Sequence, residues 1–234
     1  MQNLTKLKNN VCTYLDYQSR DRLLLSQTLN TLVHCIPNTV IFGGMLREFA
    51  LGNCRHFSSD IDIVSLASRK ELYDIIKHFS PKQNKFGGYR FFSGKQLFDL
   101  WAFEDTWAFR EGLIQATELG DIFKTTFFNL DAAAFHLSDR EFLHSKDYSS
   151  ALKNRLLDIN LEENPAPTQM ARRAVKMSIE NNLHITSRLG VYILKNHDGM
   201  AANQFSRAYI SSLKTHVETN YLENFQFNPQ RCLL

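Results

Sequence analysis

Residues 60–66 alternate acidic and aliphatic side chains and then become apolar, in the order Asp-Ile-Asp-Ile-Val-Ser-Leu. Side chains two positions apart in a β-strand lie on the same face, so Asp60 and Asp62 share one face while Ile61 and Ile63 share the other. The aliphatic face must border a core. The two carboxylates repel each other unless a cation lies between them. This segment therefore predicts both a buried sheet and the position of a site on it.

A further acidic residue, Asp99, lies inside the apolar segment Leu97-Phe98-Asp99-Leu100-Trp101. Three carboxylates on neighbouring strands can hold two metal ions about 3.5–4 Å apart. Oxygen atoms are the ligands that Mg²⁺ prefers. We therefore predict that Asp60, Asp62 and Asp99 are the catalytic and metal-binding residues of a two-metal Mg²⁺ site. Taken singly, an Asp-x-Asp pair is more often a solvated strand edge, and Asp99 can be a buried polar group with satisfied hydrogen bonds.

The short apolar segment Val40–Phe42 ends at Gly43-Gly44 and is followed by the helix-like stretch 45–51. Glycines let the backbone approach phosphate oxygens, and a helix that follows them offers unpaired N–H groups. Arg47 adds positive charge one turn further on. Alone, this pattern is most often just a tight turn. Its occurrence ahead of the acidic strand and the third carboxylate, within about sixty residues, favours binding of a nucleoside triphosphate by Gly43, Gly44 and Arg47.

The remaining pattern predicts an α/β or α+β fold, with a small mixed sheet flanked by helices. An amphipathic helix over 20–36 is expected to open the fold, and a capping box at Ser68 and Glu71 begins a helix that runs to residue 79. Residues 89–103 indicate two strands joined at Ser93-Gly94-Lys95. From residue 147 onward the pattern is helical, including the whole of 148–161. We therefore expect a catalytic domain over 1–145 and a helical domain over 146–234.

Composition excludes several classes of protein. Hydrophobic residues make up 44% and charged residues 22%, which is typical of a folded globular enzyme. No apolar run approaches the roughly 20 residues of a membrane span, so no membrane partner is expected. The four cysteines form no CxxC pair and follow a polar N-terminus, which predicts free thiols and a cytoplasmic location. The net charge of +3 is that of an ordinary solvated surface.

Five segments together resemble the head domain and neck helix of the poly(A) polymerase and CCA-adding tRNA nucleotidyltransferase family, within the DNA polymerase β-like superfamily. IFGGMLREFALG resembles its glycine motif, SSDIDIVS its metal-binding strand, and FDLWAF the strand of its third carboxylate. DIFKTTFFNLDAAAF is similar to the motif that would place a functional asparagine at Asn129. ENPAPTQMARRAVKMSIENNLHI resembles the neck helix, in which Arg173 is the candidate cation.

The resemblance implies transfer of a nucleoside monophosphate from a nucleoside triphosphate to an acceptor hydroxyl, with a tRNA-like RNA as the favoured acceptor. It also implies that Asn129 and Arg173 bind nucleotide. Thr125 and Thr126 stand where the family has an Arg-Asp pair, and the acidic–arginine template for base choice is not found. Two alternatives stay open: a toxin or defence enzyme that modifies a protein or small molecule, and a non-catalytic nucleotide-binding or RNA-binding module. The sequence predicts neither the nucleotide nor an oligomeric state.

Overall fold

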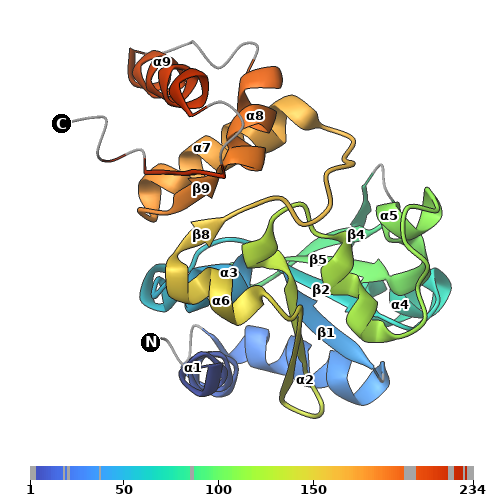
Figure 1. Ribbon diagram of the computed structural model, residues 1–234. Coiled ribbons are helices and arrows are strands. Elements are labelled where there is room, and N and C mark those ends of the chain that lie inside the picture. The colour runs from blue at the N-terminus through green and yellow to red at the C-terminus, as the bar shows by residue number, and fades with distance from the viewer. Residues whose placement is uncertain are drawn as a thin grey trace. The chain divides into compact units, whose positions relative to one another are not determined.

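The computed structural model describes residues 4–17, 19, 22–36, 38–84, 87–197, 204–220, 224–228 and 230. The chain divides into two compact units, which are described separately here (Figure 1). The first unit comprises Met1–Thr126 and Asp131–Tyr148. The second comprises Phe127–Leu130 and Ser149–Leu234. A short internal segment thus belongs with the C-terminal part of the chain.

The first unit is built on a seven-stranded sheet with the strand order β3-β4-β5-β2-β1-β6-β7. Its strands are β1 Thr39–Phe42, β2 Ile61–Ser65, β3 Lys82–Gln83, β4 Tyr89–Ser93, β5 Gln96–Ala102, β6 Ala133–His136 and β7 Glu141–His144. Strands β2 and β5 pair in parallel, whereas the other neighbouring strands pair antiparallel. The predicted mixed α/β architecture is therefore confirmed.

Five α-helices of the described residues belong wholly to this unit. They are α1 Leu4–Asp16, α2 Leu23–Cys35, α3 Gly44–Ala50, α4 Arg69–Ile76 and α5 Trp107–Arg110. The helix expected over 20–36 corresponds to α2, and residues 20 and 21 lie outside the described residues. The expectation that this helix opens the fold is wrong, because α1 precedes it. Helix α1 buries only Leu7, Val11 and Leu15, a narrow stripe within a polar segment.

Local signals in the sequence explain where α4 begins and how β4 meets β5. The Ser68 hydroxyl accepts a hydrogen bond from the Glu71 backbone N–H, and the Ser68 N–H donates to the Glu71 carboxylate at 2.8 Å, so the capping box is confirmed. Gly94 turns the β4–β5 hairpin with a φ of +59°, a conformation that glycine adopts without strain. This hairpin fixes which residues of β4 and β5 face each other.

The two faces of the sheet have different surroundings. On one face, the ring of Phe91 in β4 stacks on that of Phe98 in β5. On the other face, Val40 and Val64 form a buried cluster with Ile122, which comes from the 3₁₀ segment Leu119–Thr125. Val64 and Asp62 are two positions apart, so they share this second face. The apolar core of the second face therefore adjoins the acidic end of β2.

The second unit contains α7 Pro167–Glu180, α8 Ser187–Lys195, α9 Gln204–Thr219 and most of α6 Tyr148–Asn154, and also a small sheet. That sheet has the order β10-β9-β8, with β8 Leu156–Leu157, β9 His184–Thr186 and β10 Gln226–Phe227. The helix expected over 148–161 is therefore wrong beyond residue 154. Arg155 adopts a left-handed φ of +50°, which ends α6, and its guanidinium donates to the backbone carbonyls of Asn181 and Asn182.

The helices of the described residues lack the combination of length and hydropathy that a membrane span requires.

Candidate active site

The three aspartates singled out in the sequence lie together in the first unit. Asp62 in β2 is directly opposite Asp99 in the parallel strand β5, and Asp60 lies one position before β2. Each residue has a carboxylate oxygen within 4.8 Å of the others. We call Asp60, Asp62 and Asp99 the acid triad. In the described part of the chain, no second group of three potential metal ligands is this close together.

The chemistry of the acid triad fits a hard divalent cation. Asp99 is buried, at 4% exposure, and Asp60 and Asp62 are partly buried. The Ser59 hydroxyl donates to one oxygen of Asp60 at 2.7 Å. A ligand set made only of carboxylates suits Mg²⁺ or Mn²⁺ rather than Zn²⁺ or Cu²⁺, which favour histidine and cysteine. The acid triad could therefore hold Mg²⁺.

Arg90 is a component of the site that sequence reasoning missed. It lies directly opposite Asp99 in the β4–β5 hairpin. Its Nε donates to Asp99 at 2.8 Å, and its Nη2 donates both to Asp60 at 3.1 Å and to the second oxygen of Asp99. Hydrogen bonding to Asp99, together with the charges of all three aspartates, raises the pKa of Arg90. One guanidinium thus donates to two of the triad carboxylates and is stabilised by the charge of the third.

The sequence did carry a signal for Arg90. Once the turn of the hairpin is placed at Gly94 and Lys95, counting outward pairs Ser93 with Gln96, and the same count pairs Arg90 with Asp99. Opposite charges on directly facing positions of antiparallel strands attract each other.

The glycine turn lies beside the acid triad. Phe42 at the end of β1 is opposite Asp62, and Gly43 follows it with a φ of +72° and a ψ of −132°. That backbone conformation is open to glycine and strained for other residues. A Cβ atom on Gly43 would lie 3.5 Å from Oδ2 of Asp62. The missing side chain therefore leaves space next to one of the triad carboxylates.

Arg47 is held by protein carboxylates. It is 7% exposed, and its guanidinium donates to Asp131 and, at 3.4 Å, to Glu48. Glu48 in turn accepts a hydrogen bond from Asn53 at 3.0 Å. Burial lowers the pKa of Arg47, but the charges of Asp131 and Glu48 outweigh burial and raise it. Arg47 therefore anchors α3 to the segment around Asp131, and its predicted contact with phosphate stays a prediction.

Comparison with known proteins informs the fold. No protein-family model and no curated protein sequence matches the chain. Among solved structures, the CCA-adding enzyme of Thermotoga maritima complexed with tRNA superposes with a TM-score of 0.59 and 18% identity, over 99% of this chain and 52% of that one. A CCA-adding enzyme with CTP gives a TM-score of 0.58 and 17% identity, over 99% and 53%.

The chain has the fold of the CCA-adding enzymes. A tRNA nucleotidyltransferase complexed with a primer tRNA and an incoming ATP analogue also matches, with a TM-score of 0.51 and 13% identity over 83% of this chain and 62% of that one. The chain spans about half the length of the CCA-adding enzymes that it matches.

The other two residues predicted to bind nucleotide, Asn129 and Arg173, lie in the second unit. The Asn129 side chain accepts from the backbone N–H of Asp158 at 2.9 Å and donates to the carbonyl of Leu156 at 3.0 Å. These bonds attach the segment 127–130 to β8. Arg173 is exposed on α7, as is Arg172. Sequence reasoning preferred Arg173, and the nucleotide contacts of Asn129 and Arg173 stay predictions.

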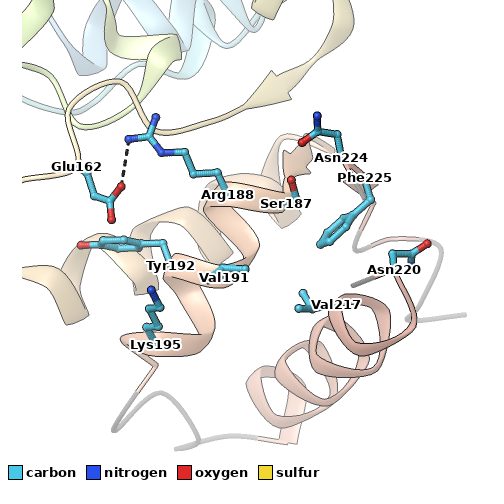
Figure 2. Close-up of a pocket in the computed structure, with 10 residues that line it drawn as sticks. All are labelled: Glu162, Ser187, Arg188, Val191, Tyr192, Lys195, Val217, Asn220, Asn224 and Phe225. Atoms are coloured by element: carbon cyan, nitrogen blue, oxygen red, sulfur yellow. Dashed lines mark hydrogen bonds and ion pairs between the residues drawn. The ribbon is translucent and has the colours of Figure 1, made fainter. Parts of the chain in front are cut away.

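The second unit of this CCA-adding fold also contains a cavity of about 480 Å³ between α8 and α9 (Figure 2). Its lining residues are Glu162, Ser187, Arg188, Val191, Tyr192, Lys195, Val217, Asn220, Asn224 and Phe225. Arg188 forms an ion pair with Glu162 at 3.1 Å, drawn as a dashed line in Figure 2, and the Tyr192 hydroxyl accepts from Asn164 at 2.7 Å. With a single carboxylate in its wall, the cavity offers no ligand set comparable to the acid triad.

Proposed function

We propose that this chain is a metal-dependent nucleotidyltransferase, which transfers a nucleoside monophosphate from a nucleoside triphosphate to an acceptor hydroxyl and releases pyrophosphate. The acid triad beside the glycine turn carries the proposal. Its three carboxylates approach within 4.8 Å on one face of the sheet, and Gly43 leaves space next to Asp62. The fold supports the proposal, since the solved structures that it matches are named as CCA-adding enzymes in complex with CTP and with tRNA.

In the proposed reaction, Asp60 and Asp62 would hold Mg²⁺. Asp99 would either share in holding it, with the proton of the attacking hydroxyl passing to solvent water, or accept that proton itself. The acceptor oxygen forms a bond to the α-phosphorus while the bond from that phosphorus to the bridging oxygen of the pyrophosphate breaks. Bound Mg²⁺ supplies stabilisation of negative charge on the phosphate oxygens and lowers the pKa of a hydroxyl that it coordinates. The protein contributes the position of the three carboxylates, because β2 and β5 fix two of them opposite each other.

The triphosphate would lie against the turn formed by Gly43 and Gly44. A side chain at Gly43 would intrude beside Asp62, so glycine keeps this approach open. Arg47, one turn into α3 and ion-paired with Asp131, is proposed to add positive charge toward the triphosphate. Asn129 and Arg173, which belong to the second unit, are proposed to bind nucleotide as well.

We propose RNA as the acceptor. Phe92 is 61% exposed and stands two positions from Arg90 on β4, so it shares the face that carries the acid triad. An exposed aromatic ring can stack on an unpaired base irrespective of its identity. The names of two matched structures, which include tRNA and a primer tRNA, support an RNA acceptor.

The experiment incubates the purified protein with each of the four α-³²P-labelled nucleoside triphosphates, Mg²⁺, total RNA and a protein extract, and then separates RNA from protein. We expect label in RNA, dependent on Mg²⁺. Asp62→Ala should abolish labelling while the circular dichroism spectrum and melting temperature stay close to those of the wild type. Asp74→Ala, which changes an exposed aspartate of α4, should stay active. An active Asp62→Ala variant contradicts the proposal, and label confined to protein contradicts the RNA acceptor alone.

A further inference from the structure

Arg90 occupies carboxylate oxygens of the acid triad that a bound cation would also draw on. Its guanidinium engages both oxygens of Asp99 and one oxygen of Asp60. A fork-shaped contact between arginine and a carboxylate is stronger and more directional than a single hydrogen bond. A guanidinium and a divalent cation also repel each other at such short range. A cation that binds Asp99 or the second oxygen of Asp60 therefore competes with Arg90 for these carboxylates.

The side chain of Arg90 has room to move and a chemistry that suits a second partner. It is 52% exposed, whereas the Asp99 side chain with which it pairs is 6% exposed. The planar guanidinium matches the oxygens of phosphate as well as those of carboxylate. A triphosphate bound at the adjacent glycine turn would offer phosphate oxygens close to the acid triad.

We propose that Arg90 is a phosphate-binding residue whose resting partners are the carboxylates of the acid triad. When a divalent cation occupies the triad, Arg90 exchanges Asp99 and Asp60 for the triphosphate of the nucleotide. Cation and nucleotide then strengthen each other's binding. A bound cation displaces Arg90 toward the triphosphate, and a bound triphosphate keeps Arg90 away from the carboxylates that hold the cation. This inference rests on the proposed nucleotidyltransferase function.

A second ion pair of the first unit provides a matched control. Arg69 donates through Nε and Nη2 to both oxygens of Asp105, so it makes the same fork-shaped contact as Arg90. Its side chain is 44% exposed, close to the value for Arg90. Asp105 is not part of the acid triad. Arg69→Gln therefore removes the same charge and the same type of contact without freeing a triad carboxylate.

The first arm of the test measures Mn²⁺ binding to the full chain without nucleotide, by electron paramagnetic resonance of free Mn²⁺. We expect Arg90→Gln to bind Mn²⁺ about tenfold more tightly than the wild type, the equivalent of one charge-assisted hydrogen-bond contact. Arg69→Gln should match the wild type, and Asp62→Ala should lose binding. Arg90→Lys keeps the charge without the planar fork, so its affinity for Mn²⁺ should lie between those of the wild type and Arg90→Gln. If Arg90→Gln does not fold, Arg90→Lys replaces it in this measurement.

The second arm measures binding of labelled ATP and CTP by equilibrium dialysis at saturating Mg²⁺. Arg90→Gln should bind the better of the two nucleotides about tenfold more weakly than the wild type, because the phosphate contact is lost. The two arms thus predict opposite changes from one substitution. Unchanged or weaker Mn²⁺ binding in Arg90→Gln, an equal gain in Arg69→Gln, or unchanged nucleotide binding would each overturn the proposal.

The first arm requires no turnover, so it is separate from the test of the proposed function. A protein that transfers nucleotide while Arg90→Gln leaves Mn²⁺ affinity unchanged keeps the function and loses the role of Arg90. A protein that labels no acceptor while Arg90→Gln binds Mn²⁺ more tightly loses the function and keeps the competition between Arg90 and the cation.

Discussion

Substitution of Gly43 by alanine adds one methyl group between the end of β1 and the acid triad. The backbone there has a φ of +72° and a ψ of −132°, which costs a residue with a Cβ about 1–3 kcal/mol. The new Cβ would lie 3.5 Å from Oδ2 of Asp62, an ordinary van der Waals distance, so a direct clash adds little. We therefore expect Gly43→Ala to fold, with a melting temperature lower by about 2–4 °C for each kcal/mol.

The same substitution should also change the activity, by a route separate from its effect on stability. The methyl group occupies the space through which the triphosphate would reach the acid triad, so we expect the KM for the nucleoside triphosphate to rise by about tenfold or more, a loss of roughly 1.4 kcal/mol in binding. Gly112→Ala is the control. Gly112 has a similar φ of +69°, and no atom lies within 4 Å of the position that its Cβ would take.

The assay compares thermal unfolding with steady-state kinetics at varied triphosphate concentration for both variants. Gly43→Ala and Gly112→Ala should lose similar stability, and only Gly43→Ala should change the KM. Equal kinetic behaviour of the two variants would refute the argument that Gly43 clears the approach to Asp62.

Three further substitutions test other parts of the structure. Burial raises the pKa of Asp121, but hydrogen bonds from Lys124 and from backbone N–H groups outweigh burial and hold that pKa well below its usual value. Asp121→Asn should therefore lower the unfolding free energy at pH 7 by about 2 kcal/mol. In denaturation measured at several pH values, this difference from the wild type should shrink as the pH falls below about 4. Asp131→Ala leaves Arg47 buried without its main partner and should cost about 3–5 kcal/mol in urea denaturation, whereas a near-neutral result would contradict a buried ion pair. Phe92→Ala should leave stability within about 0.5 kcal/mol and raise the KM for RNA about tenfold, with the KM for the triphosphate unchanged; an unchanged KM for RNA would exclude stacking on Phe92.

Short-range rules account for the parts of the site that could be predicted. The two-residue period of a strand places Asp60 and Asp62 together, and a single acid in an apolar segment marks Asp99. The register that sets Asp62 opposite Asp99 depends on strand order across the sheet, which local pattern leaves undetermined. The pairing of Arg90 with Asp99 is different, because the β4–β5 hairpin fixes it locally and counting outward from the turn at Gly94 would have predicted it.

The errors in the fold have similar physical origins. Helix α1 was missed because its three buried residues are spaced by four within a polar segment. Strands β8 and β10 contain two residues each, too few to show an alternating pattern. The helix expected past Asn154 ends because Arg155 takes a left-handed conformation, stabilised by bonds to carbonyls about 26 residues away.

The most direct test of the acid triad as a nucleotidyl-transfer centre compares triphosphates labelled at the α and at the γ position. Matched reactions of wild type and Asp62→Asn contain Mg²⁺ and the acceptor RNA, and the label that enters RNA is counted. The proposed function predicts that only α-label enters RNA, that one pyrophosphate is released for each labelled acceptor, and that Asp62→Asn loses both signals. Entry of γ-label, or α-label that persists in Asp62→Asn, would contradict the assignment.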